Sequence, residues 1–120
     1  MQHAAEAAYG LGRLAFGAGM MAAPERLGRV LIGEEAREPA VRTGFRVYGT
    51  RDVVLGLGTL RSLSGGGDPS PWLAAGITSD VLDTAVQLVE WQSIPPGKRV
   101  PGVLAALGAA LAGAALLARR

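Results

Sequence analysis

The sequence predicts an all-α fold, a bundle of four transmembrane helices with a short interfacial helix between helices one and two. The first observation behind this prediction is glycine, which accounts for 18 of the 120 residues, about twice its usual share. Glycine weakens helices in water, but in membranes small residues let helix backbones pack closely. The second observation is that no stretch alternates apolar and polar residues with period two, so we expect no strands.

The third observation is the spacing of the only two tryptophans, Trp72 and Trp91. In one helix their separation corresponds to about 28 Å, and the hydrocarbon layer of a membrane is about 30 Å thick. Tryptophan is enriched at both edges of that layer. We therefore expect the helix that carries both residues to cross a membrane.

Prolines and glycine-rich loops divide the chain into four helical segments. Helix one covers about residues 4–23 and ends before Pro24. The stretches RSLSGGGDPSP (61–71) and SIPPGKRVP (93–101) predict loops. Helix two therefore covers 41–62, helix three 71–92 and helix four 102–118. Together the segments form one membrane domain over residues 1–120.

The connection between helices one and two, PERLGRVLIGEEAREP, contains a short amphipathic stretch. Leu27, Val30 and Leu31 share a helix face, and Arg26 and Arg29 lie beside it. This pattern predicts a helix that lies in the membrane interface. An ordinary helical turn on a protein surface would show the same pattern.

Composition excludes several classes of function. There is no cysteine, so neither a disulfide nor a thiolate metal site can form. The formal charge of +2 is small, and no block of Lys and Arg with interleaved aromatics indicates nucleic-acid binding. No phosphate-binding G-x-x-x-x-G-K-[ST] motif is present, and we expect no cofactor.

The expected location is the bacterial cytoplasmic (inner) membrane, with several passes. The N-terminus MQHAAEAAYG lacks the basic region of a signal peptide. Lys and Arg are more numerous in the connection between helices one and two and in that between helices three and four. The positive-inside rule therefore places both termini outside the cytoplasm.

Five charged residues lie at the same expected depth in three helices, and these are Arg13, Arg51, Asp52, Asp80 and Asp83. The midpoint between the two tryptophans falls between the two carboxylates of helix three, which share a helix face. An unpaired charge at the membrane centre costs at least about 2.5–3.5 kcal/mol. We therefore expect these side chains to face inward and neutralise one another through Arg–carboxylate hydrogen bonds.

The balance of this cluster is two positive charges against three negative ones, so a shared proton is the expected compensation. Tyr48 and Gln87 are further candidate ligand-binding residues of the same site, beside Arg13, Arg51, Asp52, Asp80 and Asp83. A hard cation held by the three aspartates is conceivable. The two nearby arginines argue against it, so we predict no metal site.

Helix four, GVLAALGAALAGAALLA, carries no charge and is expected to act as a wall of the bundle. Its small residues Ala105, Ala109 and Gly113 recur every four positions, a spacing that supports close packing within the chain or self-association. The expected partners are the lipid bilayer and, as alternatives, a second copy or a larger membrane complex. A small polar or lipophilic ligand is also conceivable.

The stretch YGTRDVVLGLG, followed by a loop, a tryptophan and SDVLD, resembles a group of small four-helix bacterial membrane proteins of unknown function. Members of that group carry a Gly-x-Arg-Asp motif in the second helix and Asp-x-x-Asp in the third. The layout is more distantly similar to the DoxX type of small membrane protein. This resemblance implies a four-helix membrane fold and no particular reaction.

Three functional hypotheses follow. The cluster lines a transport-like site for a proton, a cation or a small polar solute. Alternatively, its ion pairs are structural, and the chain is an accessory subunit of a membrane complex. In the third hypothesis the chain is an enzyme acting on a lipophilic substrate, with Asp80 or Asp83 as general base and Arg51 stabilising an anionic intermediate. A soluble helical bundle is the alternative to any membrane protein.

Overall fold

The protein is built from helices throughout the part of the chain that its computed structural model describes, residues 2–120. The elements in chain order are α1 (Gln2–Ala22), α2 (Pro24–Ile32), the 3-10 turn η1 (Gly33–Arg37), α3 (Pro39–Ser64), α4 (Ser70–Val89), the 3-10 turn η2 (Trp91–Ser93) and α5 (Pro96–Ala118). The all-helical prediction is therefore confirmed, and a short helix does separate the first two long ones.

Prolines begin most of these helices. Pro24, Pro39 and Pro96 each occupy the first position of their helix. Proline suits that position because its fixed φ is helical and its missing N–H has no intrahelical partner there. Pro101, which was predicted to be the last residue of the loop before α5, lies inside that helix. Helix α5 therefore starts six residues earlier than predicted.

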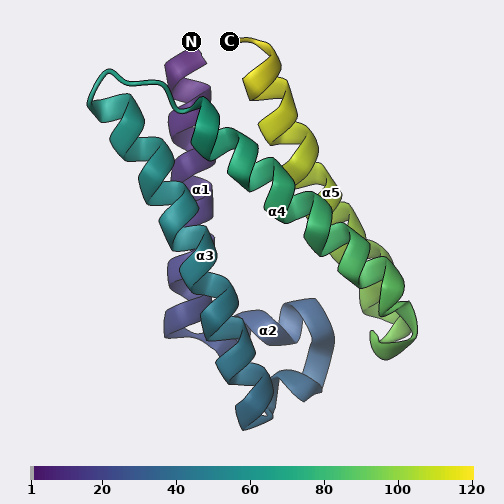
Figure 1. Cartoon of the computed structure of the whole chain (residues 1–120). Coiled ribbons are helices and arrows are strands. Elements are labelled where there is room, and N and C mark those ends of the chain that lie inside the picture. The colour runs from purple at the N-terminus through teal and green to yellow at the C-terminus, as the bar shows by residue number, and fades with distance from the viewer. Residues whose placement is uncertain (1) are drawn as a thin grey trace.

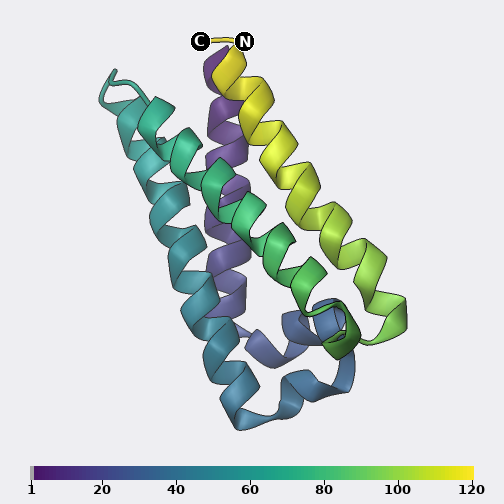
Figure 2. The same ribbon diagram turned by 45° about the vertical axis from the view of Figure 1, so that its right-hand side comes forward.

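The four long helices are arranged as two antiparallel pairs (Figure 1). Helix α1 packs against α3 along most of its length, and α4 packs against α5 in the same way. The pairs lie close together at the end that carries both termini and the connection from α3 to α4. They diverge toward the other end, where α2 and η1 lie between them (Figure 2).

Glycines allow the backbones of α1 and α3 to touch. A Cβ atom added to Gly17 would lie 2.5 Å from the carbonyl oxygen of Gly49, and one added to Gly56 would lie 2.6 Å from that of Gly10. Real Cβ atoms do not approach a backbone oxygen so closely, so any side chain at these positions would push the helices apart. Gly17, Gly49 and Gly56 therefore lie in a tight seam between α1 and α3.

The prediction of four transmembrane helices is wrong. Among residues 2–120 only α5 is long and apolar enough to cross a membrane, with a mean hydropathy of 2.1 over its most apolar window. Helices α1 and α3 are less apolar because they contain charged side chains and four glycines each, and α4 is less apolar because it contains two aspartates and several other polar side chains. A location with several membrane passes therefore has no support.

The prediction that one helix carries Trp72 and Trp91 at its two ends and crosses a membrane is wrong for a geometric reason. Helix α4 ends at Val89, and Trp91 begins the separate turn η2. Trp91 packs with Arg99, whose guanidinium carbon lies 5.8 Å from the centroid of the indole ring. The two tryptophans thus do not mark the ends of one helix, and the predicted extent 71–92 is three residues too long at its end.

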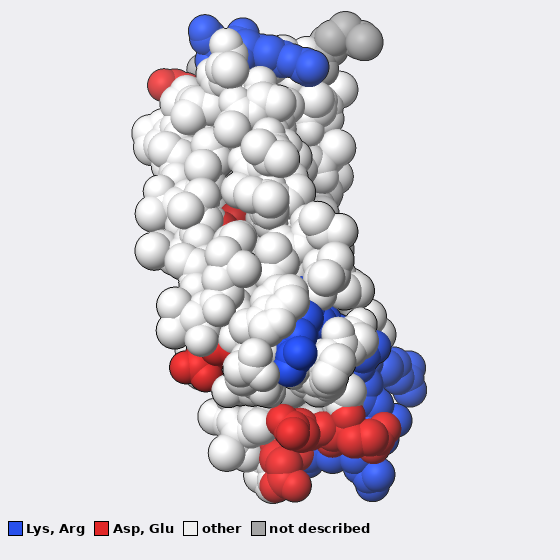
Figure 3. All heavy atoms as spheres, turned by 90° about the vertical axis from the view of Figure 1, so that its right-hand side faces the viewer, with Lys and Arg blue, Asp and Glu red and all other residues white. Residues whose placement is uncertain are grey.

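Large apolar side chains remain exposed on the outside of the second helix pair. Their positions on α4 and α5 are Val81, Leu82, Val86, Leu88, Val89, Val100, Leu104, Leu107 and Leu111. Charged side chains on this side gather toward the two ends of the molecule, and the surface between them is almost free of charge (Figure 3). We call this surface of α4 and α5 the apolar face.

Candidate functional site

Three helices bring five charged side chains together inside the molecule. Helix α1 supplies Arg13, α3 supplies Arg51 and Asp52, and α4 supplies Asp80 and Asp83. We call these five residues the Arg/Asp cluster. The predicted convergence of charges from three helices is therefore present in the structure.

Arg13 is the more enclosed of the two arginines, with a side chain that is 8% exposed, against 32% for Arg51. Its NH1 atom donates a hydrogen bond to Asp52 Oδ1 at 2.8 Å, and its NH2 atom donates to Asp80 Oδ2. NH2 also reaches the carbonyl oxygen of Gly76 at 3.2 Å. The Tyr9 hydroxyl accepts from Nε at 3.1 Å and from NH2 at 3.0 Å. One guanidinium thus ties α1 to α3 and α4.

Arg51 is held differently. It forms a bidentate pair with Asp83, in which NH1 lies 2.9 Å from Oδ1 and NH2 lies 2.7 Å from Oδ2. Its guanidinium carbon lies 4.4 Å from the centroid of the Tyr48 ring, and the Tyr48 hydroxyl donates to Asp83 Oδ2 at 3.0 Å. Nε of Arg51 has no hydrogen-bond partner in the described chain and lies 3.9 Å from Asp52 Oδ1.

The cluster has more carboxylates than guanidiniums, three against two. Burial away from water raises the pKa of Asp52, although the charge of Arg13 opposes the shift. Burial raises the pKa of Asp80 for the same reason and against the same opposing charge. The excess negative charge is therefore concentrated around Arg13, where two carboxylates share one cation.

Most of the predicted site residues meet in this cluster, but Gln87 does not. Its side chain lies beside the beginning of α5, where a Cβ added to Gly102 would be 2.6 Å from its Oε1. Tyr48 does join the site through Asp83. Ligand binding by any of these residues stays a prediction. Within residues 2–120 no three His, Cys, Asp or Glu side chains are grouped to hold a metal ion.

A second buried ion pair was not predicted. Glu6 is fully buried, and both of its carboxylate oxygens lie 2.6 Å from NH1 of Arg120. Nε of Arg120 lies 3.4 Å from Asp68, so the end of α5 is tied to α1 and to the connection before α4. The signal was available, because Glu6 lies two helical turns before Arg13 on the same buried face of α1.

Two cavities lie at the end of the molecule that carries the termini. One has a volume of about 710 Å³ and lies between α1 and α3. The other has a volume of about 470 Å³ and is lined by Gln2, His3, Asp68, Ser70 and Arg120. No residue of the Arg/Asp cluster lines either of them. Neither cavity therefore offers a solute access to the cluster.

Comparison of the chain with protein-family models, with curated proteins and with solved structures finds no match. The resemblance to small four-helix bacterial membrane proteins stays a prediction.

Proposed function

We propose that this chain is a membrane-associated helical protein whose Arg/Asp cluster binds and releases one proton. The observation that carries the proposal is the buried excess of one carboxylate, since two guanidiniums face three carboxylates around Arg13 and Arg51. A proton is the smallest species that restores the balance. Of the ligands considered, it is also the one that needs no cavity beside the cluster.

The membrane association rests on α5. Only 17% of its apolar window is buried, whereas the core helix of a soluble protein would be mostly buried. The helix also lies at the end of the described sequence, far from the position of a signal sequence. An uncovered helix of this kind, beside the exposed apolar side chains of α4, fits contact with acyl chains. The bacterial inner membrane is the location that the resemblance implies.

The proton site is supported by the surroundings of Asp80. Its carboxylate and that of Asp52 approach the same guanidinium from different helices, and both side chains are less than 10% exposed. Two carboxylates near each other in a low dielectric favour a state in which one of them is protonated. Such a coupled pair takes up its proton as a unit rather than at one residue.

Infrared spectroscopy of the protein in detergent tests the proton site directly. We expect a protonated carboxyl band near neutral pH in the wild type, with its loss as pH is raised. Asp80→Asn should remove the band, because the remaining two carboxylates then match two guanidiniums. Asp68→Asn, which changes an exposed carboxylate outside the cluster, is the matched control and should leave the band intact.

Two results would contradict this proposal. One is the absence of any titrating carboxyl band between about pH 5 and 8, a range above the ordinary Asp pKa of about 3.9. The other is a band that survives unchanged in both Asp52→Asn and Asp80→Asn. The membrane association is tested separately, since the protein should pellet with membranes and require detergent rather than alkaline carbonate for its release.

A structural role as an accessory subunit is the second candidate. It is favoured by the completeness of the hydrogen bonding, because all three guanidinium nitrogens of Arg13 have partners on neighbouring groups. In this case the apolar face would contact a partner subunit or a second copy. The infrared experiment separates the candidates, since purely structural ion pairs predict three ionised carboxylates at neutral pH. Transport of a larger solute and catalysis on a lipophilic substrate have less support, because neither cavity reaches the cluster.

A further inference from the structure

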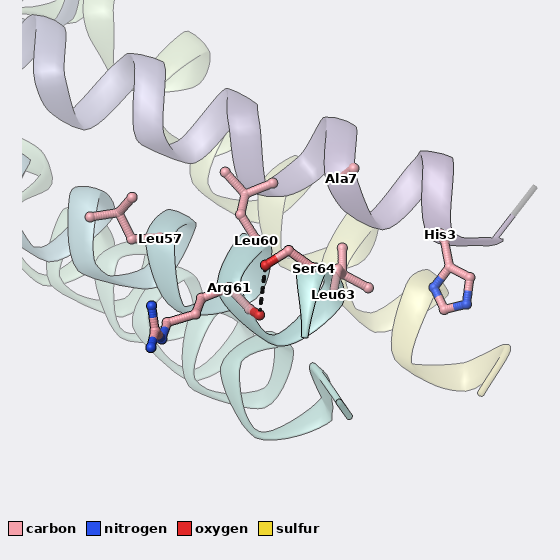
Figure 4. Close-up of a pocket in the computed structure, with 7 residues that line it drawn as sticks. All are labelled: His3, Ala7, Leu57, Leu60, Arg61, Leu63 and Ser64. Carbon is pink, nitrogen blue, oxygen red and sulfur yellow. Dashed lines mark hydrogen bonds between the residues drawn. The ribbon is translucent and has the colours of Figure 1, made fainter. Parts of the chain in front are cut away.

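The larger cavity is a groove between the first turns of α1 and the last turns of α3 (Figure 4). Its lining from α1 consists of His3 and Ala7, and α3 contributes Leu57, Leu60, Arg61, Leu63 and Ser64. The apolar side chains follow one another along α3. The polar groups His3 and Ser64 belong to the ends of their helices, next to the termini of the molecule. The guanidinium of Arg61 lies on the side of Leu57, away from His3 (Figure 4).

Arg61 gives this groove a positive charge that the protein does not neutralise. No carboxylate within residues 2–120 forms an ion pair with its guanidinium. The backbone carbonyl of Arg61 accepts a hydrogen bond from the Ser64 hydroxyl at 3.1 Å, while the guanidinium lies apart from it along α3 (Figure 4). By contrast, Arg120 at the same end of the molecule is bound to Glu6.

We propose that this groove binds one anionic phospholipid, with an acyl chain along Leu57, Leu60 and Leu63 and the phosphate at Arg61. The proposal rests on the membrane association inferred above. An arginine recognises a phosphate well because its planar donors match two phosphate oxygens. The apolar row supplies the complementary surface for the chain. A second copy of the protein is a poorer occupant, because its acidic groups would have to reach Arg61 while filling a narrow apolar groove.

Native mass spectrometry of the full chain in detergent, with added phosphatidylglycerol, measures this binding. We expect Arg61→Gln to weaken binding about tenfold, the loss of one charge-assisted contact. Arg119→Gln is the matched control, since Arg119 is an exposed arginine at the same end that does not line the groove. It should leave the affinity unchanged. Phosphatidylcholine with the same chains should bind about tenfold more weakly.

Other outcomes would overturn the proposal. Equal losses in Arg61→Gln and Arg119→Gln would indicate general attraction by positive charge rather than a site. If inorganic phosphate alone displaced the phospholipid, Leu57, Leu60 and Leu63 would take no part in its binding. Leu57→Trp fills the groove at an exposed position and should also weaken binding, so full affinity in this variant would exclude the acyl-chain site. If the protein binds the lipid in detergent but does not associate with membranes, the lipid site in the groove is supported and the proposed membrane association is contradicted.

Discussion

Arg13 and Arg51 both place a guanidinium inside the helical protein, but they differ in exposure, in their partners and in how their charge is balanced. Arg13 is 8% exposed and shares its donors among Asp52, Asp80 and uncharged oxygens. Arg51 is 32% exposed and gives both terminal nitrogens to one carboxylate, that of Asp83. The first site carries an excess negative charge and joins three helices. The second is electrically neutral and joins two.

This difference indicates a division of roles within the Arg/Asp cluster. A neutral, bidentate pair near the surface is a stable link whose charge state has no reason to change. A deeply buried cation between two carboxylates is sensitive to the protonation of either one. We therefore expect the Arg13 side to respond to pH and to substitution, and the Arg51 side to act mainly as a tether between α3 and α4.

The largest expected effect comes from Arg13→Met. It leaves two buried carboxylates without their cation, and removing one partner of a buried ion pair costs about 3–5 kcal/mol of unfolding free energy. Arg51→Met is the matched comparison and should cost about 1–3 kcal/mol, because Asp83 keeps the Tyr48 hydroxyl and some contact with water. Denaturant unfolding in detergent measures both. Equal losses would show that the two sites do not differ in the way described.

The next largest effect is the difference in stability between variants of two aspartates on the same face of α4. Asp83→Asn removes the carboxylate that accepts both hydrogen bonds of Arg51 and should cost about 1.5–3 kcal/mol. Asp80→Asn should cost less than half as much, because Arg13 keeps Asp52 and the excess negative charge disappears. Thermal unfolding in detergent provides the comparison. If Asp80→Asn proved the more damaging change, the cluster would have no surplus carboxylate.

The Arg13 side of the Arg/Asp cluster should make the stability of the fold depend on pH. Because the pKa values of Asp52 and Asp80 are raised, the folded protein binds a proton more tightly than the unfolded chain does. This contribution is complete below the ordinary Asp pKa of about 3.9 and is lost as pH rises through the raised values, by at most about 1.4 kcal/mol per proton and pH unit. Melting curves at successive pH values should show it, and Asp80→Asn should flatten the profile. A wild-type profile as flat as that of the variant would contradict the assignment.

The last comparison distinguishes the two tyrosines. Tyr9→Phe removes the acceptor of Arg13 Nε and should cost about 1–3 kcal/mol, since it leaves a buried donor unpaired. Tyr48→Phe removes one donor from a carboxylate that keeps both bonds to Arg51, and should cost about 0.5–1.5 kcal/mol. Unfolding free energies of the two variants give the order. If Tyr48→Phe lowered the unfolding free energy more than Tyr9→Phe, the hydroxyl at the more exposed Arg51 site would be the more important one for stability.

The sequence predicts the helices and the cluster because both depend on local signals. Prolines and glycine-rich loops separate the helices, and charges such as Arg51 and Asp52 are conspicuous inside an apolar helix. The position of Glu6 on the same helix face as Arg13 was a local sign that it is buried. Its partner Arg120 lies 114 positions away, and nothing in the sequence connects the two residues. The membrane spans were overestimated because the high glycine content was interpreted as a sign of packing in a membrane, and because Trp91 was assigned to the helix of Trp72. A short 3-10 turn separates it from α4, and that break has no clear signature in the sequence.

The direct contact of backbones between α1 and α3 has a mechanical consequence. Sliding one helix along the other by a turn would drive Gly17 and Gly49 out of register and pull Asp52 away from Arg13. These two helices can therefore move only as one rigid body. A change of shape between this body and the α4–α5 pair would have to break the bonds of Arg13 to Asp80, of Arg51 to Asp83 and of Arg120 to Glu6.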